Sequence, residues 1–157
     1  MASSSHVELT AALRDAGLRV TGPRLAVLSV VMAGKHMTAE QVESAARERV
    51  GAISTQAVYD VLGALTRGGF LRRIEPAGSP ARYETRVDDN HHHLVCRSCG
   101  VVADVDCAVG AAPCLSPSDA AGFVVDEAEV VFWGLCSTCQ GPNCQNHQQD
   151  IRGGATA

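Results

Sequence analysis

STQAVYDVLGALT, residues 54–66, is the stretch that most constrains the architecture of this 157-residue chain. Ser54 can cap a helix, and apolar residues then recur on one helical face until the glycine pair at 68 and 69. Two stretches with strand character follow, FLRRIE at 70–75 and ARYETRV at 81–87, with the turn-forming run PAGSP between them. The pattern therefore predicts a helix followed directly by a β-hairpin.

Three further helical patterns precede this stretch, at about 7–16, 22–33 and 38–50. A glycine follows each of them, and Thr38 with Gln41 has the spacing of a capping box. A winged helix-turn-helix has this order of helices followed by a hairpin, and its last helix before the wing enters the major groove of DNA. We therefore predict a winged-helix DNA-binding domain over residues 1–87.

The helix at 54–66 would present polar side chains to DNA from its first turns. Glutamine can pair with adenine, hydroxyl groups can meet phosphates or base edges, and arginines can contact phosphates. The alternative is an ordinary small helical domain whose arginines are only solvated. The predicted DNA-contacting residues are Arg19, Arg24, Ser54, Thr55, Gln56 and Tyr59.

The charge of the chain is divided between its two parts. The formal net charge is −4, which by itself argues against a nucleic-acid partner. Residues 1–87 hold 11 lysines and arginines against 8 acidic residues, a net charge of +3, and residues 88–157 hold 2 against 9, a net charge of −7. The first part is therefore suited to meeting phosphates, and the second to collecting cations.

All seven cysteines lie in the acidic part, and four of them form two C-x-x-C pairs, CRSC at 96–99 and CSTC at 136–139. Two such knuckles offer four thiolates in a tetrahedron, which suits a closed structural zinc site. Redox dithiols are the alternative, but a thioredoxin-type motif needs a βαβ context that this sequence does not have. No secretion signal or membrane-spanning run is visible, so we expect a reducing, cytoplasmic compartment. The predicted zinc ligands are Cys96, Cys99, Cys136 and Cys139.

A triple histidine precedes the first knuckle. In an extended segment His91 and His93 face one side and His92 faces the other, so the first two can chelate one ion. Glu84 and Asp104 stand on neighbouring predicted strands, and imidazole with carboxylate suits Fe²⁺, Mn²⁺ or Zn²⁺. The alternative is a solvated histidine-rich turn.

The rest of the acidic part predicts a small α/β unit able to dimerise, with one helix on an antiparallel sheet. Cys107 and Cys114 stand apart from the knuckles, and they are either a redox-active pair or two small buried apolar residues. We assign residues 88–140 to this unit and expect a disordered tail over 141–157. Its expected elements are strands at 101–105, 123–125 and 129–135 and a helix that begins at Ser116.

Together these motifs resemble the ferric uptake regulator family of bacterial metal-dependent repressors, over residues 10–140. Runs around Cys107 and Cys114 are similar to the actinobacterial branch that controls catalase-peroxidase genes. The motifs that carry the resemblance are Gly17-Leu18-Arg19-Val20-Thr21, His36-x-Thr38-Ala39-Glu40, Ser54-x-x-Ala57-Val58-Tyr59, Ala81-Arg82-Tyr83-Glu84, His91-His92-His93-Leu94-Val95-Cys96-x-x-Cys99-Gly100 and Gly134-Leu135-Cys136-x-x-Cys139.

The resemblance implies an α+β protein that acts as a homodimeric repressor on double-stranded operator DNA. It implies structural Zn²⁺ on the knuckle cysteines and a regulatory Fe²⁺ or Mn²⁺, for which Zn²⁺ can substitute. It also implies that Tyr59 contacts a base and that Arg19 reaches toward the minor groove. The regulatory ligands that it implies are His36, Glu84, His91, His93 and Asp104.

The expected role is control of oxidative-stress genes in response to peroxide, redox state or iron, and the alternative is an iron- or zinc-uptake regulator of the same family. Some members have an extra metal site, whose usual histidines fall at Asn90 and Ala128 here, so we expect that site to be absent and His92 to lack partners. Dedicated peroxide sensors have aspartate where this chain has Glu84, which leaves thiol oxidation as a competing redox route.

We expect no enzymatic activity, no membrane association and no small-molecule substrate. A zinc hydrolase or deaminase is the less favoured alternative, because the H-E-x-x-H motif and the deaminase pairing of H-x-E with P-C-x-x-C are missing from the sequence. A thiol oxidoreductase that uses a C-x-x-C pair is the other.

Overall fold

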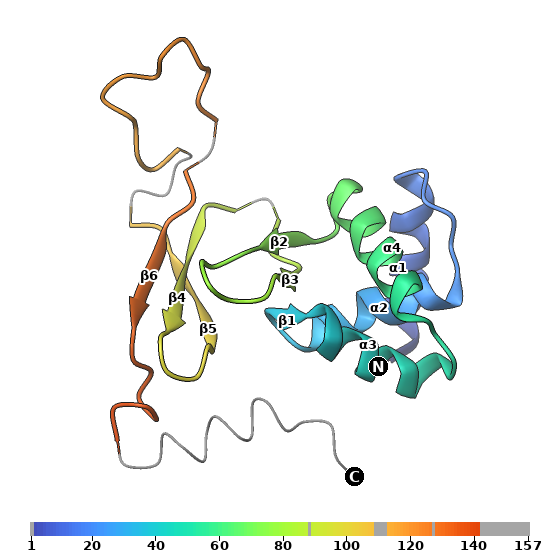
Figure 1. The fold of residues 1–157 in the computed structure, drawn as a ribbon. Coiled ribbons are helices and arrows are strands. Elements are labelled where there is room, and N and C mark those ends of the chain that lie inside the picture. Colours follow the sequence, from blue (N-terminus) through green and yellow to red (C-terminus); the bar gives the residue numbers. More distant parts are fainter. Residues whose placement is uncertain (1, 88, 109–112, 127, 142–157) are drawn as a thin grey trace. The chain divides into compact units, whose positions relative to one another are not determined.

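The computed structural model describes residues 2–87, 89–108, 113–126 and 128–141, and it divides the chain into two compact units, Met1–Val87 and Asp88–Ala157 (Figure 1). The predicted disordered tail lies outside the described residues except for residue 141. No helix among the described residues combines the length and the apolar character that crossing a membrane requires.

The first unit contains four helices, and each predicted N-cap of the last three is in place. The Thr21 hydroxyl accepts a hydrogen bond from the backbone N–H of Arg24, and the Ser54 hydroxyl accepts one from Ala57. Thr38 and Gln41 form the predicted capping box, with bonds of 3.3 and 2.9 Å. The helices are α1 (Ala2–Asp15), α2 (Gly22–Ala33), α3 (Ala39–Val50) and α4 (Thr55–Arg67).

One apolar core joins these helices to the wing. On α4, Val58, Leu62 and Leu65 recur at helical spacing and are buried, so this helix packs one face inward and leaves the other exposed. Leu71 and Tyr83 contribute from the hairpin. The other buried members of this core are Leu13, Val27, Leu28, Val30, Val31, Ala39, Val42, Ala46 and Ile53.

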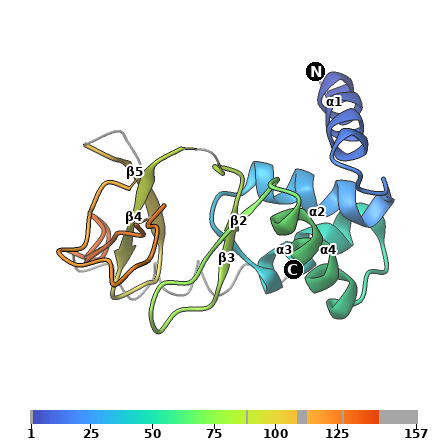
Figure 2. The ribbon, with the colours of Figure 1, turned by 90° about the horizontal axis from the view of Figure 1, so that it is seen from above.

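The wing is a three-stranded antiparallel sheet in the order β1-β3-β2. β2 (Arg72–Ile74) and β3 (Arg82–Glu84) run side by side as the predicted hairpin (Figure 2). β1 (Met37–Thr38) pairs with β3 and was not predicted, because two residues are too few to show a period of two. This short strand ties the segment before α3 to the wing.

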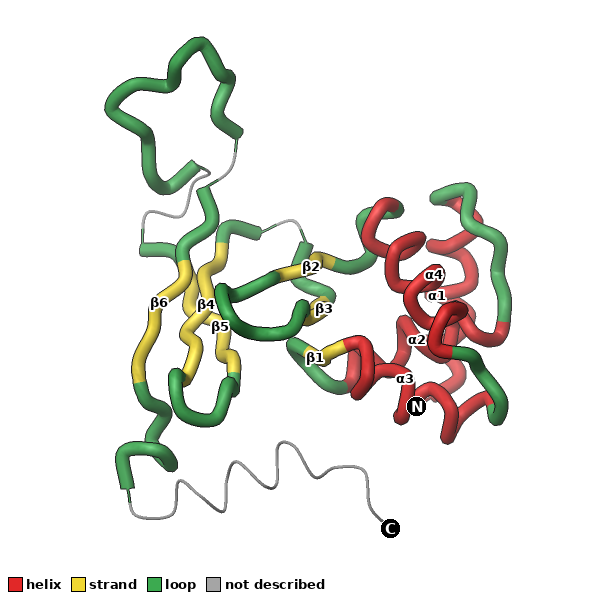
Figure 3. The backbone as a smooth tube through the Cα atoms, in the orientation of Figure 1, coloured by secondary structure: helices red, strands yellow, loops and turns green. Residues whose placement is uncertain are grey.

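The second unit is a mixed sheet in the order β5-β4-β6 (Figure 3). β4 (His91–Cys96) pairs antiparallel with β5 (Val102–Asp106) and parallel with β6 (Val131–Gly134). The expectation of a wholly antiparallel sheet was therefore wrong. β5 already returns the chain to the end of the sheet where β4 begins, so the chain has only to reach the other edge of β4 before β6 runs parallel to it.

The helix predicted from Ser116 and the strand predicted at 123–125 do not form in the described part of this unit (Figure 3). The Asp119 carboxylate accepts a hydrogen bond from the backbone N–H of Ala121 at 2.8 Å, a local turn that competes with a helix. Ala121 then adopts a positive φ of 48°, which a helix does not continue through. Local side-chain bonding therefore overrides the capping signal of Ser116.

Candidate metal centres and DNA-facing helix

The four knuckle cysteines converge, with all four sulfurs within 4.8 Å of one another. The Sγ atoms of Cys99 and Cys136, one from each knuckle, are 3.8 Å apart. Cys96, Cys99 and Cys139 are buried, and Cys136 is half-buried. Four sulfur donors with no oxygen or nitrogen among them fit a closed structural zinc site.

Strand direction explains why the knuckles meet. Cys96 ends β4 and is the parallel partner of Gly134, which ends β6, so the residues after both strands emerge at the same end of the sheet. The Arg97 backbone N–H extends this pairing by donating to the Gly134 carbonyl at 2.8 Å. Gly100, with a φ of +75°, turns the chain back so that the Cys96 N–H reaches the Val101 carbonyl.

The two cysteines of the first knuckle differ in acidity. Burial opposes ionisation of Cys96, but backbone N–H groups of Cys136, Cys99 and Ser98 bond to its sulfur and lower its pKa to about 6. One of these bonds crosses between the knuckles, from the Cys136 N–H to Cys96 Sγ at 3.4 Å. Burial raises the pKa of Cys99. The site therefore favours the thiolate, the form that binds metal, at Cys96.

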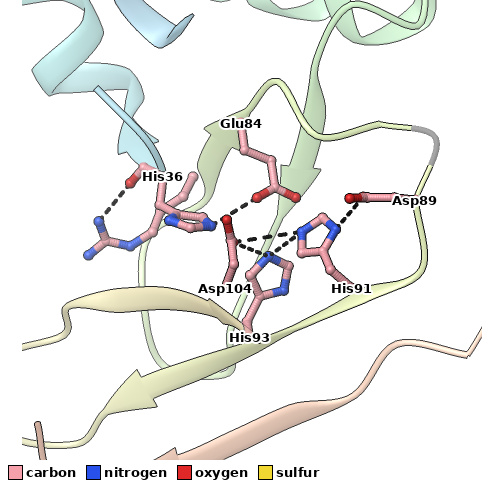
Figure 4. Close-up of polar contacts among 7 residues, drawn as sticks. His36, Glu84, Asp89, His91, His93 and Asp104 are labelled. Atoms are coloured by element: carbon pink, nitrogen blue, oxygen red, sulfur yellow. Dashed lines mark hydrogen bonds and ion pairs between the residues drawn. The ribbon is translucent and has the colours of Figure 1, made fainter. Parts of the chain in front are cut away.

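A second donor set lies at the other end of β4. The Nε2 atoms of His91 and His93 are 3.2 Å apart, and Asp104 Oδ1 is 3.8 Å from the first and 3.9 Å from the second (Figure 4). His93 and Asp104 are direct cross-strand partners, which is why they share a face. Both histidines are buried. Two imidazoles with one carboxylate fit a divalent ion such as Fe²⁺, Mn²⁺ or Zn²⁺.

Asp89 orients this set, and sequence reasoning did not assign it a role. Its Oδ1 is 2.6 Å from His91 Nδ1, and an ionised carboxylate can only accept a hydrogen bond there (Figure 4). The proton of a neutral His91 is therefore on Nδ1, and the lone pair of Nε2 points toward His93 and Asp104. The available signal was a carboxylate two residues before a histidine in an extended run.

The first unit holds the other two predicted regulatory ligands side by side. His36 Nε2 is 2.9 Å from Glu84 Oε2, and both side chains are buried (Figure 4). His36 has a φ of +46°, a conformation that typically costs about 1–3 kcal/mol and needs support from the surroundings. Two features supply that support. Arg82 Nη1 donates a hydrogen bond to the His36 carbonyl at 2.9 Å, and the next residue, Met37, begins β1 and pairs with β3.

The expectation that His92 lacks partners was wrong. Its Nε2 is 3.3 Å from Cys114 Sγ, and the donor atoms of His92, Cys107 and Cys114 all lie within 4.8 Å of one another. Strand alternation turns His92 away from His91 and His93, toward the face where the two cysteines lie. Burial and a hydrogen bond with Cys107 raise the pKa of Cys114. Both thiols are half-buried, so neither is a fully buried apolar residue.

The predicted DNA-contacting residues of α4 lie on its exposed side, but most of them also have partners within the protein. The Ser54 hydroxyl caps the helix, the Thr55 hydroxyl donates to Glu43 at 2.8 Å, and Gln56 Nε2 donates to Asp60 at 2.9 Å. Tyr59 is 53% exposed and belongs to no core cluster of the described residues.

The two predicted arginines precede this helix in the chain. Arg19 is exposed, and Arg24 is half-buried and donates to the backbone carbonyl of Arg19. That bond holds the two residues together next to the start of α2. Because Arg19 is exposed, a phosphate could approach it.

Comparison with known proteins gives concordant matches. The model of the Ferric uptake regulator family matches residues 15–113. The transcriptional regulator FurA of Mycobacterium tuberculosis is 60% identical over 136 residues, which cover 87% of this chain and 92% of that protein. The crystal structure of the Vibrio cholerae ferric uptake regulator is similar with a TM-score of 0.62 and 27% identity, over 81% of this chain and 98% of the other. The Pseudomonas aeruginosa ferric uptake regulator with manganese gives a TM-score of 0.58 and 27% identity, over 80% and 95%.

Proposed function

This chain belongs to the ferric uptake regulator family, and from that membership we propose that it is a homodimeric transcriptional repressor whose affinity for operator DNA is raised by a regulatory metal ion. The resemblance drawn from the sequence motifs is confirmed, as is the predicted α+β class with an N-terminal winged helix-turn-helix. The similarity to a mycobacterial FurA agrees with the predicted actinobacterial branch. Since the relatives are named as regulators, they lend no support to the hydrolase or oxidoreductase alternatives.

The observation that carries the proposal is the donor set of His91, His93 and Asp104, with Asp89 holding the His91 tautomer. A sensor needs a site that binds and releases its ion, and nitrogen and oxygen donors exchange metal more readily than four thiolates do. Fe²⁺ or Mn²⁺ is the proposed ion, with Zn²⁺ as a substitute. The manganese complex of the Pseudomonas aeruginosa regulator supports Mn²⁺ as one of these candidates.

We infer that His36 and Glu84 complete the regulatory ligand set, as the family resemblance implies. They belong to the DNA-binding unit, whereas His91, His93 and Asp104 belong to the second unit. When bound to both sets, the ion would supply a restraint on the angle between the two units. In a dimer that angle sets the spacing of the two copies of α4 against operator half-sites. Metal binding would then raise DNA affinity, and DNA would tighten metal binding by the same factor.

The four knuckle cysteines have a separate, structural role in this proposal. Zinc on Cys96, Cys99, Cys136 and Cys139 would join the ends of β4 and β6, which are far apart in sequence. Structural zinc sites of this type contribute about 10–16 kcal/mol of apparent binding free energy to folding at neutral pH. In this proposal the structural zinc stays bound and keeps the second unit folded, and the exchangeable regulatory ion controls the affinity for DNA.

We propose a second copy of the chain as the partner of the exposed apolar face of the second unit. Leu94 and Phe132 are cross-strand neighbours on β4 and β6 and are 46% and 48% exposed. They lie on the face of the sheet opposite to His91 and His93. Neighbouring exposed apolar side chains of this kind are what a partner subunit would cover. Further exposed apolar residues of the unit are Leu115, Phe123, Val124 and Leu135.

Control of catalase-peroxidase genes is the proposed role, by likeness to the actinobacterial branch. One residue favours the alternative within the family, a regulator of iron or zinc uptake. Glu84 occupies the position where the resemblance implies aspartate in dedicated peroxide sensors. The thiols of Cys107 and Cys114 offer a peroxide route that does not depend on Glu84.

A gel-shift series on the promoter of the chain's own operon tests the metal switch. We expect Mn²⁺ to be required for binding, and we expect His91→Ala to abolish this activation while one equivalent of zinc per chain persists. His6→Ala, which changes an exposed histidine on α1, is the matched control and should bind as the wild type does. Binding that ignores both Mn²⁺ and chelation would overturn the switch. Loss of zinc from His91→Ala would overturn the division into two metal sites.

A further inference from the structure

One histidine and two cysteines of the second unit come together away from both donor sets already described. His92 lies between His91 and His93 on β4 but faces the opposite side of the sheet. There its Nε2 is 3.3 Å from Cys114 Sγ, and its ring meets Phe132 edge-on with centroids 6.2 Å apart. Cys107 brings a second sulfur within 4.8 Å of both donor atoms, and no disulfide joins the two thiols.

The three donor atoms are spaced like ligands of one ion. Zinc lies about 2.3 Å from sulfur and about 2.0–2.1 Å from imidazole nitrogen, so the edges of a tetrahedral site measure roughly 3.5–3.8 Å. The distance of 3.3 Å between His92 and Cys114 is close to that edge. The other separations, which are at most 4.8 Å, would need to shrink by no more than about 1.3 Å. His92 is only 6% exposed, so an ion there would be partly shielded from water.

We propose that His92, Cys107 and Cys114 form a third metal site, which takes a thiophilic d¹⁰ cation, Zn²⁺ or Cu⁺. Two thiolates with one imidazole favour such ions over Mn²⁺, which prefers oxygen ligands. Three protein donors leave one coordination position open, so the ion exchanges more readily than one held by four thiolates. The site does not depend on the proposed DNA binding, because its three donors all belong to the second unit.

An ion at this site would tie the segment that follows β5 to the first residues of β4. Cys107 comes directly after the last residue of β5. His92 is flanked on β4 by His91 and His93, which carry the regulatory donors on the other face of the strand. A thiophilic ion on one face of β4 therefore restrains the strand from which the regulatory imidazoles project.

Cobalt titration of the full-length, reduced protein tests the proposal. Loading one equivalent of Zn²⁺ first occupies the four-thiolate site, and the regulatory donors contain no sulfur. Thiolate-to-cobalt charge-transfer absorption then reports on the three remaining cysteines, which are Cys107 and Cys114 of the third site and Cys144, which lies outside the described residues. We expect this absorption to saturate when one Co²⁺ per chain is bound at the third site. It should disappear or fall by about half in Cys107→Ser and in Cys114→Ser. His92→Ala should weaken Co²⁺ binding by at least about tenfold. Cys144→Ser is the matched control and should titrate as the wild type does.

Two competition arms distinguish the physiological ion. Displacement of Co²⁺ by a small excess of Zn²⁺ assigns the site to zinc, and displacement only by Cu⁺ under anaerobic conditions assigns it to copper. Three results would overturn the proposal: no charge-transfer absorption in the zinc-loaded protein, absorption that survives both cysteine substitutions, or absorption that appears only as the first zinc is lost. Failure of these thiols to bind Co²⁺, together with a Cys107–Cys114 disulfide that forms when added hydrogen peroxide supplies the two-electron oxidant, would also overturn it, in favour of a redox pair.

Discussion

Cys96, the last residue of β4, is the parallel strand partner of Gly134, the last residue of β6. This pairing brings the two C-x-x-C knuckles to one end of the sheet, although 36 residues separate them in sequence. The only tryptophan, Trp133, lies next to Gly134 on β6, and the guanidinium of Arg97 in the first knuckle stands 5.2 Å from the centre of its ring. The fluorescence of the Trp133 indole should therefore report on whether the two knuckles are held together.

Removal of zinc should disturb the second unit and leave the first unit folded. We expect chelation to shift the Trp133 emission to longer wavelength while the far-UV helical signal is kept, because every helix among the described residues belongs to the first unit. Cys136→Ser should reproduce the shift, and Thr138→Ser in the same knuckle should not. An unchanged emission spectrum in protein shown to be free of zinc would contradict this prediction.

The pH dependence of zinc affinity should change near pH 6. The pKa of Cys96 is lowered to about 6, so above that pH its sulfur is already ionised and zinc displaces no proton from it. Below pH 6 the thiol is protonated, and zinc must displace about one additional proton. The slope of log affinity against pH should therefore increase by about one as the pH falls through 6. Competition with a chromophoric chelator between pH 5 and 8 measures the slope, and an unbroken line would refute the prediction.

Asp89→Ala should lower the affinity for the regulatory ion without changing the affinity for the structural zinc. Loss of a carboxylate that orients a ligand histidine typically lowers metal affinity by about 10–100-fold. Asp89→Asn should recover much of this loss, because its amide oxygen can still accept the Nδ1 proton of His91. Isothermal titration with Mn²⁺ at fixed zinc content measures both variants. Equal losses in the two variants would indicate that the carboxylate acts through its charge instead.

Tyr59→Ala should separate DNA binding from stability. The side chain is 53% exposed on α4, so we expect unfolding free energy to change by no more than about 0.5 kcal/mol. Loss of a base contact should weaken operator binding by about 1–3 kcal/mol, which is roughly 5–150-fold. Tyr83→Ala is the contrasting variant, because Tyr83 is 6% exposed in the core and its truncation should cost about 3–5 kcal/mol. Normal operator affinity in Tyr59→Ala would exclude the contact.

Thr38→Ala should destabilise the first unit through the N-terminus of α3. The substitution removes one bond of the capping box, which typically costs about 1 kcal/mol. Thr66→Ala is the matched control: its hydroxyl bonds back to the Leu62 carbonyl within α4, a bond that contributes little to a helix. Urea unfolding followed by the helical signal compares the two, and similar midpoints would show that the cap is dispensable.

Much of the first unit could be predicted because its signals are local. Thr21, Thr38 and Ser54 cap helices through bonds to residues three positions ahead, and an apolar stripe identifies the buried face of α4. β1 escaped prediction, since two residues carry no period and its partner β3 lies more than forty residues away. The false helix at Ser116 came from a capping signal that the turn at Asp119 and Ala121 overrides.

Donor chemistry was readable from sequence, because all seven cysteines and four of the six histidines lie in the second part of the chain. The amino-acid sequence by itself determined the caps, the helices, the charge division and which side chains can bind metal. Only the tertiary structure decided that two further pairs of side chains meet: His92 with Cys114, and Asp89 with His91. The physical reason is that strand direction and strand face are set by pairings between distant segments. The alternation along β4 is local and was readable from the sequence, but its antiparallel pairing with β5 and its parallel pairing with β6 assign each donor its neighbours, and these pairings are not encoded in a local run of residues.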